Sequence, residues 1–159
     1  MKNYTNLLLL FALVLSISFT GCGKDDEKPD TDAPILDLSK EENNPFENRT
    51  YTKGGPLPLN ATFKDESGMK SCAVSIVYND ATPKTQLKGI GSPWTPVENG
   101  DIDNLSFEGK KGEETVTKEQ LFGQNIEASC LSGIYTITFD MEDKVGNKSQ
   151  KKVNIVIGN

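Results

Sequence analysis

Residues Ser132–Ile157, with the sequence SGIYTITFDMEDKVGNKSQKKVNIVI, carry the clearest strand pattern of this chain. The first half of this stretch alternates apolar and polar residues, the pattern of a strand with one buried face, with apolar Tyr135, Ile137, Phe139 and Met141. Residues 143–147 form a turn because Gly146 and Asn147 tolerate positive φ, and the alternation then resumes. The sequence therefore predicts a β-hairpin, which needs further strands because two strands alone are marginally stable in water.

Upstream, residues 57–79 repeat this pattern around a second turn. Residues 57–63 alternate, residues 64–68 carry turn residues, and the following strand places four residues on one face, Cys72, Val74, Ile76 and Tyr78. We therefore expect a second hairpin over residues 57–79. Shorter strands are predicted at 34–38, where Pro34 suits an edge strand, and at 49–52.

The middle of the chain has a weaker pattern. Glycines and prolines divide residues 86–114 into short apolar pieces, which indicates loops with one or two short strands. Residues 117–123 are typical of a short connector helix, with Thr117 as N-cap, Gln120 at the capping-box position and Gly123 as C-cap. Together these features predict an all-β, antiparallel β-sandwich with one short connector helix.

Composition excludes several functional classes. The chain of 159 residues suits one domain, and its formal net charge of -6 disfavours nucleic acid as a partner. The absence of histidine excludes Ser-His-Asp and Cys-His catalysis and His-ligated zinc. A carboxylate pair of the glycosidase type remains possible chemically, but nothing in the sequence places two carboxylates across a cleft. We therefore expect a protein without catalytic activity and without a cofactor.

The N-terminus reads as an export signal. Residues 1–21 contain one basic residue, Lys2, and an apolar run over residues 7–19 that is too short to span a bilayer comfortably. Phe19-Thr20-Gly21-Cys22 resembles the lipobox of bacterial lipoproteins, which implies cleavage before Cys22 and lipidation of that residue. A plain secretory signal cleaved elsewhere is the alternative.

The residues after Cys22 resemble an address signal. Lys24, Asp25, Asp26 and Glu27 are similar to the signal that sends Bacteroidetes lipoproteins to the cell surface, although a charged run is also typical of a solvated tether. The expected organisation is a signal peptide at 1–21, a lipidated flexible tether at 22–32 and a folded domain at 33–159. The expected location is the outer membrane, with the domain facing the cell exterior.

Three segments together resemble one family. Residues 133–147 resemble the penultimate strand and last turn of bacterial immunoglobulin-like and fibronectin type III-like domains, and residues 61–69 resemble their early strand and turn. With the lipobox and Asp32-Ala33-Pro34, the chain resembles small immunoglobulin-like lipoproteins of unassigned function from Bacteroidetes. The resemblance implies an immunoglobulin-like sandwich in which Tyr135 either hydrogen-bonds back to the preceding corner or simply packs in the core.

Two cysteines remain once Cys22 is lipidated. An even pair in an exported domain favours a disulfide between Cys72 and Cys130. The alternative is two buried free thiols, because cysteine packs well as a small apolar residue.

Acidic residues in the tether and turns could bind Ca²⁺ if these segments converge, as they do in cadherin-like modules. Backbone capping in turns explains the same residues, and we therefore predict no metal site. The candidates are Asp30, Asp32, Asp65, Glu66, Asp140, Glu142, Asp143 and Asn147.

Trp94 is the candidate binding residue. It lies between Pro93 and Pro96, where an exposed indole can stack on a sugar or on a partner's apolar patch, or can fold back to cap the core. The expected function is a surface module that binds a glycan, a peptide or a neighbouring outer-membrane protein through the loops of residues 80–124. The alternative is a structural lipoprotein that docks through a sheet edge.

Overall fold

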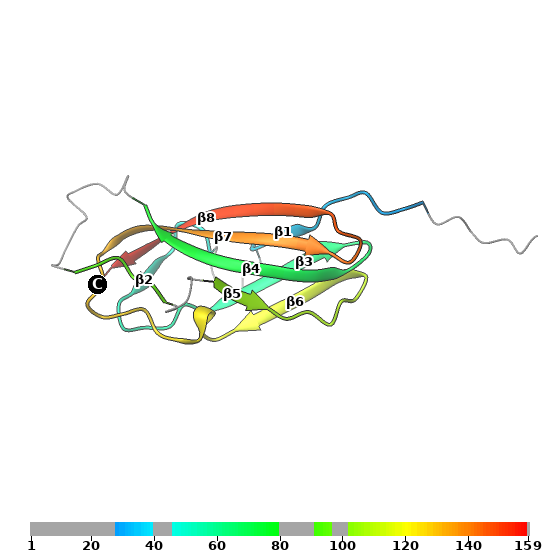
Figure 1. Cartoon of the computed structure of the whole chain (residues 1–159). Helices are drawn as coiled ribbons and strands as arrows, with labels where there is room; N and C mark the ends of the chain where they lie inside the picture. The colour runs from blue at the N-terminus through cyan, green and yellow to red at the C-terminus, as the bar shows by residue number, and fades with distance from the viewer. Residues whose placement is uncertain (1–27, 40–45, 80–90, 97–101, 159) are drawn as a thin grey trace, which may run out of the picture.

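The computed structural model describes residues 28–39, 46–79, 91–96 and 102–158. These residues form strands in two layers and a single 3₁₀ turn (Figure 1). The elements are β1 (Ile35–Asp37), β2 (Thr50–Thr52), β3 (Leu59–Asp65), β4 (Met69–Tyr78), β5 (Ile102–Leu105), β6 (Gly112–Lys118), the 3₁₀ helix η4 (Leu121–Gly123), β7 (Gly133–Asp143) and β8 (Lys148–Gly158).

The strands form a three-stranded sheet in the order β1-β3-β6 and a five-stranded sheet in the order β2-β8-β7-β4-β5. The predicted hairpin is confirmed: β7 pairs antiparallel with β8, from Gly133 opposite Ile157 to Glu142 opposite Lys148. The all-β sandwich is also confirmed. Its one parallel pair among the described strands is β2 with β8, which the prediction of a purely antiparallel sandwich missed.

The second predicted hairpin is wrong. Strands β3 and β4 follow one another along the chain, but β3 belongs to the smaller sheet and β4 to the larger. The turn between them carries the chain from one layer to the other, and Gly68 adopts φ +90 there. Both arrangements need the same alternation and the same turn residues, and for this reason the local pattern did not distinguish them.

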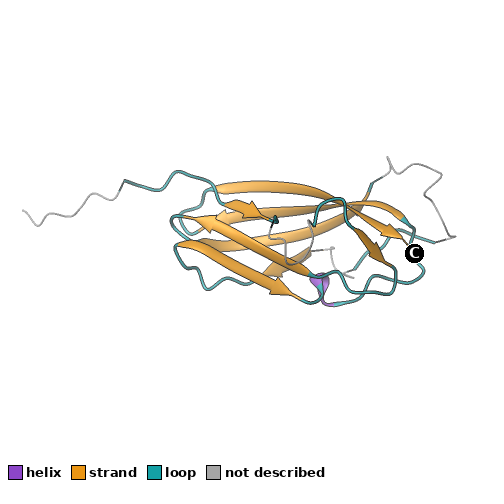
Figure 2. Ribbon diagram, turned by 180° about the vertical axis from the view of Figure 1, so that it is seen from behind, coloured by secondary structure: helices purple, strands orange, loops and turns teal. Residues whose placement is uncertain are grey.

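The core lies between the two sheets (Figure 2). The predicted buried face of β4 is confirmed, since Cys72, Val74 and Ile76 are buried and Tyr78 is half-buried. The largest fully buried side chains are Tyr135, Phe63, Phe139, Leu57, Leu59, Leu121, Ile126, Ile137, Ile155, Ile157, Val74 and Val153. At about 25 cal/mol for each Å² of apolar area removed from water, these side chains dominate the stability of the fold.

The connector helix is shorter than predicted. Strand β6 continues through Lys118, so Thr117 is a strand residue and not an N-cap. The helix η4 begins at Leu121, and its N-cap Gln120 makes no side-chain capping hydrogen bond. Leu121 and Phe122 are buried, as expected for a connector that packs inward. Pairing of β6 with β3 along its whole length removes the backbone donors that a longer helix would have used.

The two ends of the sandwich carry different segments of the chain. The turn between β3 and β4, the turn between β7 and β8, and the entry of the chain into β1 all lie at one end, which we call the turn end (Figure 1). The C-terminus lies at the opposite end.

Candidate functional site

Three aspartates meet at the turn end. Asp30 precedes β1, Asp65 ends β3 and Asp143 ends β7. One carboxylate oxygen of each lies within 4.8 Å of the others, and Asp65 and Asp143 are only 8% and 0% exposed. We call these three residues the aspartate cluster. The segment before β1 and the two turns therefore converge, which is the arrangement that calcium binding requires.

Local hydrogen bonds explain why Asp65 and Asp143 hold these positions. Oδ1 of Asp65 accepts hydrogen bonds from the backbone N–H groups of Ser67 and Gly68, at 2.9 and 2.8 Å. Oδ1 of Asp143 accepts from three N–H groups of the next turn, at 2.6 to 2.9 Å. Each aspartate thus closes its own turn, as aspartate commonly does. Backbone capping therefore explains the position of Oδ1 in both aspartates.

Asn147 joins the N-terminal segment to the turn after β7. Its Nδ2 donates to the backbone carbonyl oxygens of Asp30 and Asp32, at 3.3 and 3.0 Å, and to Oδ2 of Asp143 at 2.8 Å. Burial raises the pKa of Asp143, but hydrogen bonds from Asn147, Gly146 and Val145 outweigh it, and the pKa lies below its ordinary value. The carboxylate of Asp143 is therefore ionised at neutral pH.

The other calcium candidates do not join the cluster. Glu66 is exposed beside a shallow depression that Lys28, Lys111 and Lys144 also line. Asp140 is exposed and accepts a hydrogen bond from Gln150. Glu142 pairs with Lys70 and Lys148. The structure thus brings together Asp30, Asp65, Asp143 and Asn147, whereas Asp140 and Glu142 alternate with the buried residues of β7 and point out of the sandwich.

Tyr135 occupies a buried corner in the core. Its hydroxyl donates to the carbonyl oxygen of Leu131 at 2.7 Å and accepts from the backbone N–H of Trp94 at 3.1 Å. This confirms the expected hydrogen bond back to the preceding corner. Burial raises the pKa of the Tyr135 phenol well above its ordinary value, so the hydroxyl stays a donor at neutral pH.

Trp94 is not an exposed binding residue. Its side chain is 2% exposed and its ring meets the ring of Phe122 edge-to-face, with 5.9 Å between centroids. The prediction of a binding role for Trp94 is therefore wrong, and the alternative that it caps the core is correct. Burial of an indole removes a large apolar area from water, and the hydrogen bond to Tyr135 satisfies the backbone N–H beside it.

The predicted disulfide is also wrong. Cys72 lies opposite Met141 on β7, whereas Cys130 contacts Tyr135. Those two β7 residues are separated by about 20 Å along an extended strand, far beyond the ~4.4–6.8 Å between Cα atoms that a disulfide allows. Both cysteines are buried free thiols, and burial raises the pKa of Cys72 to about 12.

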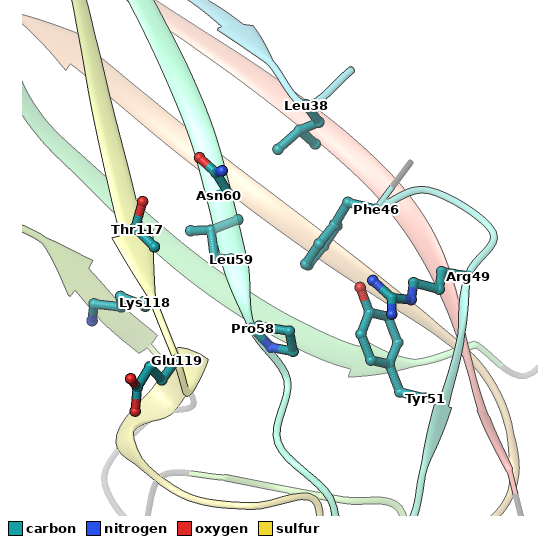
Figure 3. A pocket seen from close by; sticks show the side chains of 10 residues that line it. All are labelled: Leu38, Phe46, Arg49, Tyr51, Pro58, Leu59, Asn60, Thr117, Lys118 and Glu119. Atoms are coloured by element: carbon teal, nitrogen blue, oxygen red, sulfur yellow. The ribbon is translucent and has the colours of Figure 1, made fainter. Parts of the chain in front are cut away.

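A cavity of about 210 Å³ opens between β2 and the smaller sheet (Figure 3). We call it the inter-sheet cavity. Apolar side chains from both sheets share its walls with polar residues at the end of β6. It is lined by Leu38, Phe46, Arg49, Tyr51, Pro58, Leu59, Asn60, Thr117, Lys118 and Glu119.

The inter-sheet cavity combines aromatic, cationic and amide groups. The rings of Phe46 and Tyr51 lie 6.0 Å apart, and the guanidinium of Arg49 lies 5.2 Å from the centroid of the Tyr51 ring. Burial raises the pKa of Tyr51, which keeps the phenol neutral. Oδ1 of Asn60 is buried without a hydrogen-bond partner among the described residues, and it therefore offers an acceptor to a ligand.

Sequence reasoning did not single out these cavity residues. Residues 49–52 were expected only as a short strand. The sequence places Arg49 and Tyr51 on the same face of that strand, but it does not show which residues pack against this face. The cavity exists because β2 pairs parallel with β8 in one sheet while β3 belongs to the other. That arrangement depends on the tertiary structure.

The predicted anchor and address residues lie outside the described part of the chain. They are Cys22, Lys24, Asp25, Asp26 and Glu27. Lipidation, export and the division into signal peptide, tether and domain therefore stay predictions. Within the residues that the structure describes, no helix has the length and apolar character needed to cross a membrane.

Comparison with models of known protein families gives a match over most of the chain. The model of a family described as a domain of unknown function (DUF4625) matches residues 20–158, which include every described strand of both sheets. No curated protein matches the chain.

Proposed function

We propose that this chain, which belongs to the DUF4625 family of domains of unknown function, is a non-catalytic surface lipoprotein that binds a glycan, a peptide or a neighbouring outer-membrane protein. In this proposal, acyl chains on Cys22 hold the protein to the outer membrane. Lys24, Asp25, Asp26 and Glu27 direct it to the cell exterior. The inter-sheet cavity receives part of the ligand.

The arrangement of strands supports an immunoglobulin-like reading of the fold. A β1-β3-β6 sheet facing a β2-β8-β7-β4-β5 sheet, with the hydroxyl of Tyr135 bonded to the carbonyl of Leu131, resembles fibronectin type III-like sandwiches. Such sandwiches serve many unrelated functions, so the fold alone assigns none. The function must be argued from a site.

The inter-sheet cavity is the observation that carries the proposal. Its volume of about 210 Å³ is smaller than the ~300–1,000 Å³ of pockets that enclose a whole small-molecule ligand. It therefore suits one side chain or one sugar unit of a larger partner. The guanidinium of Arg49, which lies over the buried ring of Tyr51, offers a cation, and the unsatisfied oxygen of Asn60 offers an acceptor.

Two other functions are less well supported. Docking through a sheet edge would use β6, which pairs only with β3 among the described strands, but Glu113, Glu114 and Lys118 are the kind of charged residues that protect an edge from such pairing. A carboxylate glycosidase needs two carboxyl groups about 5 Å or more apart across a cleft. The described lining of the inter-sheet cavity contains one acidic residue, Glu119.

A cavity-filling variant tests the binding proposal. Thr117 is exposed at the cavity, so Thr117→Trp should block entry without disturbing the core. Thr115→Trp, on the same face of β6 but outside the cavity lining, is the matched control. We expect wild type and the control to bind a common set of probes on a glycan or peptide array, and Thr117→Trp to lose at least about tenfold in affinity at unchanged melting temperature. Equal binding by both variants would contradict the proposal.

Location needs a separate experiment. Replacement of Lys24, Asp25, Asp26 and Glu27 by alanine should leave lipidation intact but keep the domain facing the periplasm. Protease added to intact cells should then digest the wild-type domain and spare the variant. Equal digestion of both proteins would contradict the address role.

A further inference from the structure

We propose that the aspartate cluster at the turn end binds one Ca²⁺ ion. Its donors are carboxylate oxygens from Asp30, Asp65 and Asp143, and all three lie within 4.8 Å of one another. Oxygens on opposite sides of a Ca²⁺ ion are about 5 Å apart, because each Ca–O distance is about 2.3–2.6 Å. One ion therefore fits among these three oxygens without a change of backbone.

A second observation points to a missing partner in the cluster. Oδ1 of Asp30 accepts a hydrogen bond from the backbone N–H of Asp32 at 2.9 Å, but Oδ2 is shielded from solvent and has no hydrogen-bond partner among the residues that the structure describes. A buried carboxylate oxygen without a donor destabilises the fold, because it has lost its hydrogen bonds to water and no protein group replaces them. A cation bound to Asp30 would remove this cost.

The charge balance around the cluster supports the same conclusion. Two of the carboxylates are at least nine-tenths buried, and none of the ion pairs in the described part of the chain includes any of the three. Lys28, Lys111 and Lys144 line the neighbouring depression, but the ammonium of Lys144 donates to the carbonyl oxygen of Gly109. Like charges this close repel one another in a poorly solvated site, and a divalent ion offsets that repulsion.

The site is held ready for an ion by its turns. The hydrogen bonds to Asp65 go to Oδ1, from Ser67 and Gly68, and they fix the carboxylate while its second oxygen accepts none of them. Backbone N–H groups of Val145, Gly146 and Asn147 fix Oδ1 of Asp143, and the side-chain amide of Asn147 donates to its Oδ2. Binding then costs little conformational entropy, since two of the three ligands are already ordered.

The donor set favours Ca²⁺ over other cations. The cluster offers only oxygens, the chain has no histidine, and both Cys72 and Cys130 lie elsewhere in the core, which disfavours zinc and copper. Mg²⁺ requires near-ideal octahedral geometry with oxygens about 2.0–2.1 Å from the ion. Three carboxylates completed by water suit the larger and more flexible shell of Ca²⁺.

Calcium would fix the direction in which the chain enters the domain. Asp30 lies in the segment before β1, whereas Asp65 and Asp143 belong to the rigid ends of β3 and β7. An ion shared by all three joins the entering segment to both sheets. Hydrogen bonds from Asn147 to the carbonyl oxygens of Asp30 and Asp32 connect the same segment to the turn after β7.

Calcium titration of the full-length protein tests the site. The protein is purified in detergent, stripped with EGTA and titrated calorimetrically with CaCl₂ at constant ionic strength. We expect one ion per chain with a Kd in the range of about 10⁻⁴ to 10⁻³ M that is common for extracellular modules. At a tenfold excess over Kd, CaCl₂ should raise the melting temperature by about 3–6 °C.

Three isosteric variants distinguish binding of Ca²⁺ at the aspartate cluster from a general effect of Ca²⁺ on the negative charge of the protein. Asp30→Asn and Asp65→Asn should each weaken Ca²⁺ binding at least about tenfold, and the first lies outside every strand and should not impair folding. Asp140→Asn removes the same charge from an exposed position and should bind Ca²⁺ as wild type does. Absence of binding by wild type, equal loss in Asp140→Asn, or an equal response to MgCl₂ and CaCl₂ would each overturn the proposal.

Discussion

The backbone N–H of Trp94 donates a 3.1 Å hydrogen bond to the hydroxyl of Tyr135, across a separation of 41 residues. The same hydroxyl donates to Leu131, so one phenol satisfies a donor and an acceptor from two different segments. Trp94 in turn covers the ring of Phe122. The region expected to present a binding loop is thus partly anchored to the core.

Removal of this hydroxyl should destabilise the domain. Tyr135→Phe leaves the N–H of Trp94 and the carbonyl of Leu131 without their partner, and we expect a loss of about 1–3 kcal/mol in the free energy of unfolding. The control is Tyr78→Phe, whose ring packs edge-to-face on Tyr135 at 5.2 Å while its hydroxyl makes no hydrogen bond to the described residues. Urea denaturation of both variants measures the difference. Equal stability of the two variants would contradict this role for Tyr135.

Truncation of Trp94 should affect stability rather than recognition. Trp94→Ala leaves a cavity beside Phe122, and a buried Trp→Ala change costs about 3–5 kcal/mol. Because Trp94 is the only tryptophan, its fluorescence in the wild type should shift to longer wavelength on unfolding and resist quenching by acrylamide while the protein is folded. An easily quenched native signal, or an unchanged melting temperature in the variant, would mean that the indole is exposed.

Gly68 should tolerate substitution less well than Gly112. Both adopt positive φ, near +90 and +88, so alanine brings the same backbone strain of roughly 1–2 kcal/mol to each. A Cβ at Gly68 would lie 2.7 Å from the carbonyl oxygen of Lys110, whereas a Cβ at Gly112 would meet nothing within 4 Å. We therefore expect Gly68→Ala to lower the melting temperature further than Gly112→Ala. The reverse order would argue against the close approach of these turns.

Stability should fall at alkaline pH because Cys72 is buried as a neutral thiol. Its pKa rises from 9.0 to about 12 in the folded chain, so above pH 9 the unfolded state loses a proton that the folded state keeps. The stabilising effect is complete below pH 9 and disappears as pH approaches 12. Cys72→Ala should therefore show a shallower decline between pH 9 and 12 in denaturation experiments, although Tyr51 and Tyr135 contribute to the decline in both proteins.

The same burial determines the reactivity of the cysteines. Iodoacetamide should label neither Cys72 nor Cys130 in the folded protein, and both after unfolding without prior reduction. Peptide mapping that finds the two residues linked would contradict the free-thiol assignment.

The alternation of apolar and polar residues was sufficient to predict which face of each long strand is buried. Tyr135, Ile137 and Phe139 on β7, and Val74 and Ile76 on β4, all lie in the core as expected. The hairpin of β7 and β8 was also readable, because a short turn brings neighbouring segments together. The hydrogen bond from Tyr135 followed from a resemblance to known sandwiches rather than from the pattern.

Pairing between distant segments required the tertiary structure. The turn after β3 resembles the turn after β7 in its residues, yet β3 and β4 enter different sheets while β7 and β8 share one. The number of residues between Cys72 and Cys130 likewise does not show how far apart they lie in the folded chain, and whether they form a disulfide was therefore not predictable from the sequence. Each of these outcomes depends on which surfaces pack together, and a local pattern contains no information on that choice.

The aspartate cluster was predictable from the sequence only in part. The turn positions of Asp65 and Asp143 were predictable from the sequence, since aspartate accepts hydrogen bonds from the backbone N–H groups that follow it. The approach of Asp30 to these two residues, and the exclusion of Asp140 and Glu142, depend on how the sheets pack. The physical reason is that alternation points successive side chains of β7 to opposite faces, while packing of the two sheets brings the ends of β3 and β7 together beside the entering chain.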